Sequence, residues 1–154
     1  MTFDKALYDK VDGPAKAALS AVLKTKDYEI INGAGDELYN TDVVAQKPGG
    51  PIVRFECSVK NKRYFDGIVS GYYRNIWIPL RKIINKNISD WYVFFPDTYN
   101  EMLMISATVV KNSPTRIVEN QHKQKEETIS VDRKQAIRYR INPDNTADNL
   151  GKLV

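Results

Sequence analysis

Cysteine and histidine are scarce in this sequence, whose 154 residues include one of each, Cys57 and His122. A lone cysteine excludes an internal disulfide and fits a reducing compartment, so we expect a cytoplasmic protein. One cysteine and one histidine are also too few for the usual ligand set of a zinc site. A Ser/His/Asp triad would need His122, but the polar stretch ENQHKQKEE around it indicates a surface residue.

Long apolar runs are missing as well. No segment approaches the roughly 18 consecutive apolar residues of a membrane-spanning helix. The N-terminal stretch MTFDKALYDKVDG mixes acids and bases and lacks the apolar centre of a secretory signal. The stretch GAGDE contains neither a GxGxxG pattern nor a Walker lysine, which argues against a dinucleotide or NTP loop. These absences favour a soluble protein.

The composition is that of an ordinary globular domain, with 42% hydrophobic and 27% charged residues. A chain of this length can bury one core. Residues 142–154 are short of apolar side chains, so we expect a single domain over residues 1–141 and a flexible C-terminal tail. The formal charge of +4 and the pI of about 9.1 are compatible with a polyanionic partner, although many basic proteins bind no nucleic acid.

The hydrophobic pattern predicts a helical segment at the N-terminus. Residues 2–26 have helical spacing, and Gly13-Pro14 is expected to divide them because proline is tolerated at a helix start and poorly inside a helix. The apolar face of the second part consists of Ala18, Leu19, Val22 and Leu23.

The rest of the chain is rich in strand patterns. A strand pair flanks the turn PDTYN, and residues 115–127 are interpreted as a short helix or a loop. The other predicted strands cover residues 28–31, 40–46, 51–60, 75–80, 128–131 and 136–141, the last as an edge strand. A leading helix followed by a mostly β body predicts an α/β (α+β) fold.

Two carboxylates stand in neighbouring predicted strands, within the stretch TDVVAQKPGGPIVRFECSVKN. Asp42 opens the first strand, and Glu56 lies in the second, beyond the turn KPGG. Because side chains alternate along a strand, Glu56 shares one face with Arg54, Ser58 and Lys60, while the apolar residues between them form the core face. A hairpin would bring both carboxylates to one cleft. The alternative is two solvent-facing acids, with Glu56 paired to Arg54 or Lys60.

Two carboxylates and a lysine suit metal-dependent hydrolysis of a phosphodiester. Mg²⁺ prefers hard oxygen ligands and keeps several of its waters. A metal-bound water becomes a nucleophile near neutral pH, and the ion neutralises charge on the phosphate. A nearby lysine can orient the water and stabilise the developing negative charge.

This pattern resembles the PD-(D/E)xK nuclease superfamily, which has the restriction-endonuclease-like fold. The resemblance implies an N-terminal helix, then a central mixed β-sheet flanked by helices, and metal-dependent hydrolysis of DNA with Asp42 and Glu56 holding Mg²⁺. The lysine of the family motif would stand at position 58, where this chain has Ser58. Lys60, on the same strand face, and Lys82, after the strand at residues 75–80, are the two candidates for its catalytic role.

Basic and aromatic residues follow the motif in the stretches KNKRYF, GYYRNIW and IPLRK. Lys62, Arg63, Arg74 and Arg81 are expected to contact DNA phosphates. The rings of GYYRNIW would stack on unpaired bases or, alternatively, pack into the core.

Three functions stay open at this point: a Mg²⁺-dependent nuclease, a catalytically inactive module that binds nucleic acid or another partner on the same fold, and an interaction protein without a nucleic-acid role. Ser58 favours the second, because the family lysine is missing there. A homodimer would suit the cutting of both strands of a duplex, but no residue pattern marks a dimer surface.

Overall fold

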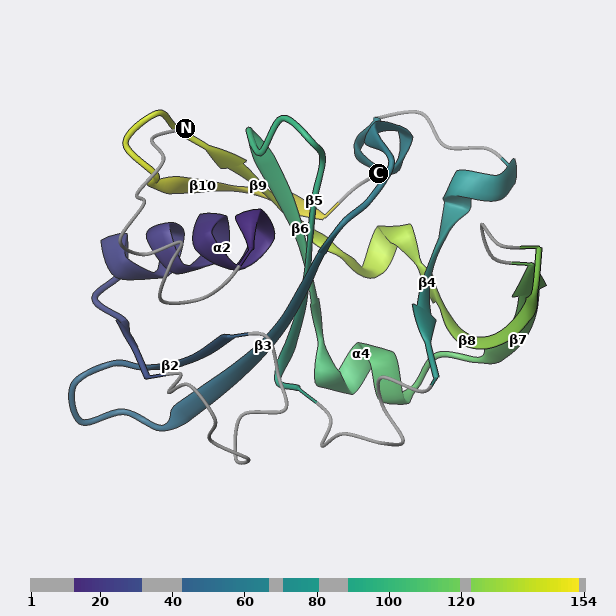
Figure 1. Ribbon diagram of the computed structural model, residues 1–154, viewed down its shortest axis with the longest axis horizontal. Coiled ribbons are helices and arrows are strands. Elements are labelled where there is room, and N and C mark those ends of the chain that lie inside the picture. The colour runs from purple at the N-terminus through teal and green to yellow at the C-terminus, as the bar shows by residue number, and fades with distance from the viewer. Residues whose placement is uncertain (1–12, 32–42, 67–70, 81–88, 120–122, 153–154) are drawn as a thin grey trace.

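The computed structural model describes residues 13–31, 43–66, 71–80, 89–119 and 123–152 (Figure 1). This part of the chain is mixed α/β, with most elements in two β-sheets and few helices. The fold class predicted from the sequence is confirmed at that level. No helix among these residues is long and apolar enough to cross a membrane.

A 7-stranded sheet forms the centre of the molecule, with the strand order β1-β2-β3-β5-β6-β9-β10. The pair β3 and β5 is parallel and the other pairs are antiparallel, so the sheet is mixed. Its strands are β1 (Glu29–Ile30), β2 (Val43–Gln46), β3 (Ile52–Val59), β5 (Trp91–Phe95), β6 (Glu101–Ser106), β9 (Ile137–Ile141) and β10 (Ala147–Lys152).

A smaller antiparallel sheet has the strand order β4-β8-β7. Its strands are β4 (Asn75–Pro79), β7 (Thr115–Glu119) and β8 (Lys125–Asp132). The helical elements are α2 (Pro14–Thr25), α4 (Ala107–Lys111) and the 3₁₀ turns η2 (Lys62–Phe65), η3 (Gly71–Arg74) and η4 (Arg133–Gln135). Parallel strands need a crossover connection, and the one between β3 and β5 contains β4, so the chain visits the small sheet before it returns.

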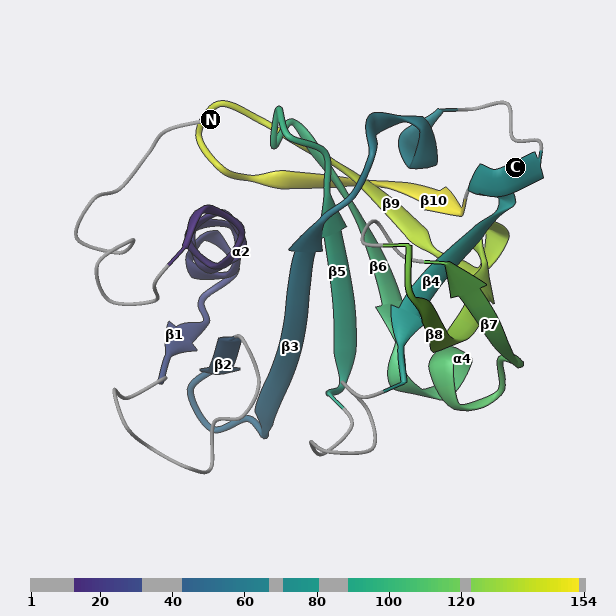
Figure 2. The same ribbon diagram turned by 45° about the vertical axis from the view of Figure 1, so that its right-hand side comes forward.

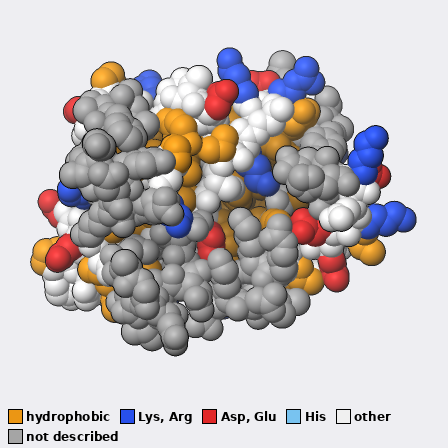
Figure 3. All heavy atoms as spheres, in the orientation of Figure 1, with side chains coloured by type: hydrophobic (Ala, Val, Ile, Leu, Met, Phe, Trp, Pro, Cys, Tyr) orange, Lys and Arg blue, Asp and Glu red, His pale blue; other side chains and the backbone are white. Residues whose placement is uncertain are grey.

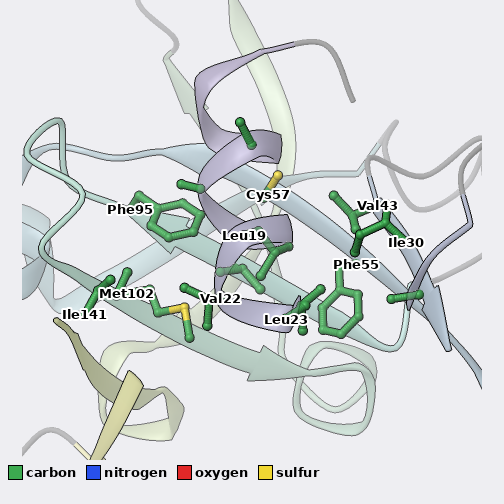
Figure 4. Packing of buried hydrophobic residues seen from close by; sticks show 14 residues of the cluster. Leu19, Val22, Leu23, Ile30, Val43, Phe55, Cys57, Phe95, Met102 and Ile141 are labelled. Carbon is green, nitrogen blue, oxygen red and sulfur yellow. The ribbon is translucent and has the colours of Figure 1, made fainter. Parts of the chain in front are cut away.

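The helix α2 begins at Pro14, as the sequence predicted for the part after Gly13. Gly13 has a φ of 115°, which glycine tolerates because it has no Cβ, and proline suits the first helical position, where no N–H is needed. The predicted apolar face is buried against one face of the central sheet, where it meets Phe55 of β3 and Phe95 of β5 (Figure 4). This contact forms the first hydrophobic core.

The opposite face of the central sheet is covered too. Figure 2 shows three layers: α2, the central sheet, and the small sheet together with α4. Alternation along β5 divides its side chains between two cores, because Val93 and Phe95 face α2 while Tyr92 and Phe94 face the small sheet. The strand β5 therefore has both faces buried, as do residues 55–57 in the middle of β3.

The stretch expected to be a short helix or a loop forms strands instead. Residues 115–119 make up β7, which pairs with the first part of β8. Ile117 of β7 is 70% exposed. Because the strand buries so little, its sequence lacks a hydrophobic pattern that would have predicted it. The backbone hydrogen bonds of the β7–β8 ladder hold it in place.

The C-terminal segment also differs from the expectation of a flexible tail. Residues 147–152 form β10, which pairs with β9, so β9 is not the edge strand. The turn between them is closed by the Asn142 amide, which donates to the Thr146 carbonyl at 2.8 Å, and the ladder carries an ion pair of 2.9 Å between Arg140 and Asp148. Polar contacts hold this segment in place. Its shortage of apolar side chains had predicted that it would fray.

Candidate active site between the two sheets

A cavity of about 180 Å³ lies where β3 and β5 of the central sheet face β4 of the small sheet. Its floor and walls come from strands that are distant in sequence but brought together by the crossover. Among the described residues it is lined by Glu56, Cys57, Ser58, Val59, Lys60, Trp77, Ile78, Pro79, Tyr92 and Phe94.

Glu56 is a buried member of this cavity, with 6% of its surface exposed. It lies in the middle of β3, paired in register with Tyr92 of the parallel strand β5. The sequence pattern had assigned the apolar residues of β3 to the core and left the Glu56 face as the polar one. That expectation was incomplete, because the small sheet covers the second face. A solvent-facing Glu56 is excluded.

Lys60 extends the same wall just beyond the end of β3. Its backbone amide donates to the Phe95 carbonyl at 2.8 Å, which continues the contact with β5. Its ammonium donates to the Trp77 carbonyl of β4 at 3.1 Å and lies 5.4 Å from the centre of the Phe94 ring. The lysine thus spans from one sheet to the other and brings a positive charge into the cavity that contains Glu56.

Tyr92 also lines this cavity and is 2% exposed. Burial raises the pKa of its hydroxyl, the Ser89 backbone acts in the opposite direction, and the negative charge of Glu56 raises the pKa further. The phenol therefore stays protonated at neutral pH and can act as a hydrogen-bond donor.

A second cavity of about 510 Å³ adjoins the first and shares Val59, Lys60 and Trp77 with it. Its other lining residues are Asn61, Tyr64 and Tyr73. In the space-filling view, a lysine or arginine side chain lies in a recess near the centre of the face that is shown, with hydrophobic side chains beside it (Figure 3). Together the two cavities form a groove; we call the smaller one, lined by Glu56, the narrow cavity and the larger one, lined by Tyr64 and Tyr73, the wide cavity.

Three of the basic residues expected to contact DNA are exposed at or near this groove. Lys62 and Arg63 belong to η2, and the Arg63 guanidinium lies 5.7 Å from the centre of the Tyr73 ring. Arg74 ends η3 and lines a separate cavity of about 250 Å³ together with Asp132, Arg133 and Lys134.

Arg133 is a residue that the sequence reasoning did not single out. It is 1% exposed, and its Nη1 donates to the Tyr64 carbonyl at 2.9 Å and to the Arg63 carbonyl at 3.3 Å. Desolvation lowers the pKa of its guanidinium. Arg133 therefore positions η2, and with it Arg63, relative to the small sheet. Nothing in the polar stretch VDRKQ distinguishes the buried Arg133 from its exposed neighbours.

The other predicted site residues, Asp42, Arg81 and Lys82, lie outside the described residues. The ladder between β2 and β3 begins with the pair Val43 and Phe55. In the part of the chain that the structure describes, no group of three or more His, Cys, Asp or Glu side chains could hold a metal ion. The described site thus contains Glu56 and Lys60 of the predicted catalytic set.

The sequence singled out the rings of GYYRNIW, of which Tyr73 and Trp77 line these cavities, but it missed the residues that β5 contributes. Tyr92 and Phe94 alternate with core residues in WYVFF, so a period of two indicates a shared face. It does not indicate that this face looks onto Glu56, because the parallel pairing of β3 with β5 has no local signal.

Fold and site together define a mixed α/β protein with a carboxylate and a lysine in a cavity between two sheets. Comparisons of the chain with models of protein families, with curated proteins and with solved structures found no match. The resemblance to the PD-(D/E)xK superfamily accordingly rests on the sequence pattern.

Proposed function

We propose that this protein is a metal-dependent nuclease that hydrolyses DNA phosphodiester bonds on a restriction-endonuclease-like core, with its active site in the Glu56 cavity. The observation that carries the proposal is that Glu56 of β3 and Lys60, which directly follows β3, line one cavity between the sheets. Burying a carboxylate costs free energy, and such groups concentrate at functional sites. An acid with a merely solvating role would lie on the surface.

Magnesium fits the chemistry of this donor set. Mg²⁺ is usually held by one or two carboxylates, with waters and substrate phosphates completing its octahedron. Glu56 would be one protein ligand. We take Asp42 as the second ligand. It directly precedes β2 in the sequence, and Val43, the first residue of β2, pairs with Phe55, the neighbour of Glu56. When bound, the ion would supply an activated water and neutralise charge on the phosphate.

The residues around the ion would each have a distinct task. The Lys60 ammonium, held at the Trp77 carbonyl, would stabilise negative charge on the phosphate, with Lys82 as the alternative for this role. Tyr92, which stays protonated, would donate a hydrogen bond from the cavity wall. Lys62 and Arg63, exposed at the mouth, would hold the DNA backbone.

Arg74 and Arg81 complete the proposed phosphate contacts. Arg74 is exposed at the end of η3, where it would reach the backbone beyond the groove. Arg81 follows the small-sheet strand β4 by two residues in sequence. A dimer of such sites would be needed for both strands of a duplex to be cut together.

The second candidate function is a DNA-binding module without catalysis. Ser58 favours it, since a serine lines the cavity at the position of the family lysine. This module would bind DNA through the same basic residues, and its affinity would fall as the salt concentration rises.

A cleavage assay with Glu56→Gln separates the two. The substitution keeps the size of the side chain and removes its charge. With single- and double-stranded DNA in Mg²⁺, we expect cleavage by the wild type, none in EDTA, and a loss of at least about 100-fold in the variant, since even outer-shell partners of a metal are worth 10–100-fold. Glu119→Gln, at an exposed position on β7, is the matched control and should retain activity.

Two results would contradict the nuclease. Equal cleavage by wild type and Glu56→Gln, or cleavage that persists in EDTA, would show that the activity does not come from this site. Salt-sensitive DNA binding without any hydrolysis would instead support the binding module.

A further inference from the structure

The depth of Glu56 restricts which form of DNA can reach it. The carboxylate belongs to a residue that is 6% exposed, in a cavity of about 180 Å³ between two sheets. A DNA duplex is stiff, with a persistence length of about 150 bp, so its phosphates follow a regular contour. An unpaired strand bends more easily than a duplex, so its phosphates can follow a recess of this size more readily than those of a regular duplex.

The adjoining wide cavity offers a path for such a strand. Its volume of about 510 Å³ lies within the range of about 300–1,000 Å³ that is typical of small-molecule sites, so it can accept a nucleotide. Because it shares Val59, Lys60 and Trp77 with the narrow cavity, a nucleotide in it would be adjacent to a phosphate near Glu56.

The walls of the wide cavity combine rings and positive charges. Tyr73 and Trp77 are half-buried there, Lys60 lies between the cavities, and the Arg63 guanidinium lies over the Tyr73 ring. Aromatic rings with adjacent cations are the features with which proteins bind single strands, because each unpaired base presents a face for stacking. In a duplex those faces are already stacked on one another.

Trp77 lies on β4 between two residues of the second core. Its neighbours Ile76 and Ile78 on β4 are buried in the second core, where they pack with Phe94 and Ile105. Trp77 alternates with them and belongs to neither hydrophobic core of the described residues. This distinguishes it from Tyr64, which is 5% exposed and part of that core.

We propose that the site acts on unpaired DNA, with one base of the strand stacked against Trp77 while the adjoining phosphate occupies the Glu56 cavity. This inference rests on the proposed function and names the form of DNA that it would use. It also assigns Trp77 as the residue that selects that form.

The sequence contains two tryptophans, Trp77 and Trp91, which makes the test direct. Trp91 packs beside the first core, on the face of β5 that α2 covers. The Trp91→Phe variant therefore reports Trp77 fluorescence alone, and Trp77→Phe is its matched control. Both are titrated in EDTA at low salt with oligothymidylate of about 15 nucleotides, a length that fills a typical single-strand site, and with a duplex of the same length.

We expect oligothymidylate to quench the fluorescence of the Trp91→Phe variant and to leave that of Trp77→Phe unchanged, with little quenching by the duplex. Trp77→Ala should lower the affinity for oligothymidylate by about 5- to 150-fold, the range of one base–aromatic contact, while Trp77→Phe keeps most of it. Circular dichroism establishes that each variant is folded, and the phenylalanine variants keep the test valid if Trp77→Ala is not.

Failure of this inference can be told apart from failure of the proposed function. Absence of Trp77 quenching, or equal affinity for duplex and single strand, would overturn the inference even where Glu56-dependent cleavage of duplex DNA is found. Quenching by the single strand without any cleavage would uphold the unpaired-strand site and reject the nuclease.

Discussion

Leu19→Ala should remove much of the stability of the protein without changing its site. Leu19 is fully buried where α2 meets the central sheet. A buried leucine-to-alanine change costs about 2.7–5.0 kcal/mol, and the cost rises with the size of the hole that remains. Because Leu19 has no exposed surface, we expect a cost within this range, about 3–5 kcal/mol. That is a large part of the about 5–15 kcal/mol that stabilises a typical domain.

Urea unfolding followed by circular dichroism measures this effect. With a slope of about 1–3 kcal/mol per molar urea, the midpoint should fall by at least about 1 M. Ile117→Ala, at an exposed position on β7, is the control and should stay within about 0.5 kcal/mol of the wild type. Leu19 lies on the sheet face opposite to Glu56, so the folded variant should keep the DNA binding that we propose for the wild type. A loss below about 1 kcal/mol would refute the packing of α2 on the central sheet.

The remaining predictions concern the C-terminal strands. Hydrogen bonds from Arg140 and then Asn142 lower the pKa of Asp148 from its ordinary value of 3.8. The contribution of Asp148 to stability is therefore complete above pH 3.8 and is lost as the pH falls through the lowered pKa. An NMR titration of the carboxyl should give a midpoint below 3.8 that rises in Arg140→Gln, and a midpoint at or above 3.8 in the wild type would contradict the contact. The ion pair of 2.9 Å between Glu101 and Arg138 joins β6 to β9, and a double-mutant cycle with Glu101→Gln and Arg138→Gln should give a coupling of about 0.2–1 kcal/mol. A coupling of zero would show that the two charges act independently.

Several elements of the fold follow from local patterns. Helical spacing after Gly13-Pro14 predicts α2 and its buried face, and KPGG predicts the β2–β3 hairpin. These elements are local because their hydrogen bonds and turns join residues close in sequence. β7 and β10 had no such signal, because their side chains are mostly exposed and pairing with a neighbouring strand alone holds them.

The sequence predicted individual residues of the candidate site but not the segments that surround them. Alternation along the predicted strand assigned Glu56 and Lys60 to one face, and in the structure both residues line one cavity. What lies opposite them depends on the crossover from β3 through β4 to β5. That path joins residues far apart in sequence, and no periodicity within a single strand records it.

By itself, the sequence determined which side chains share a strand face, because the backbone geometry of a strand fixes that alternation. Only the tertiary structure decided that the face with Glu56 is buried. The sequence pattern of a strand shows which of its own residues are polar. Whether those residues are buried depends on which other segment packs over them. Here β4 of the small sheet lines the same cavity as Glu56 of β3.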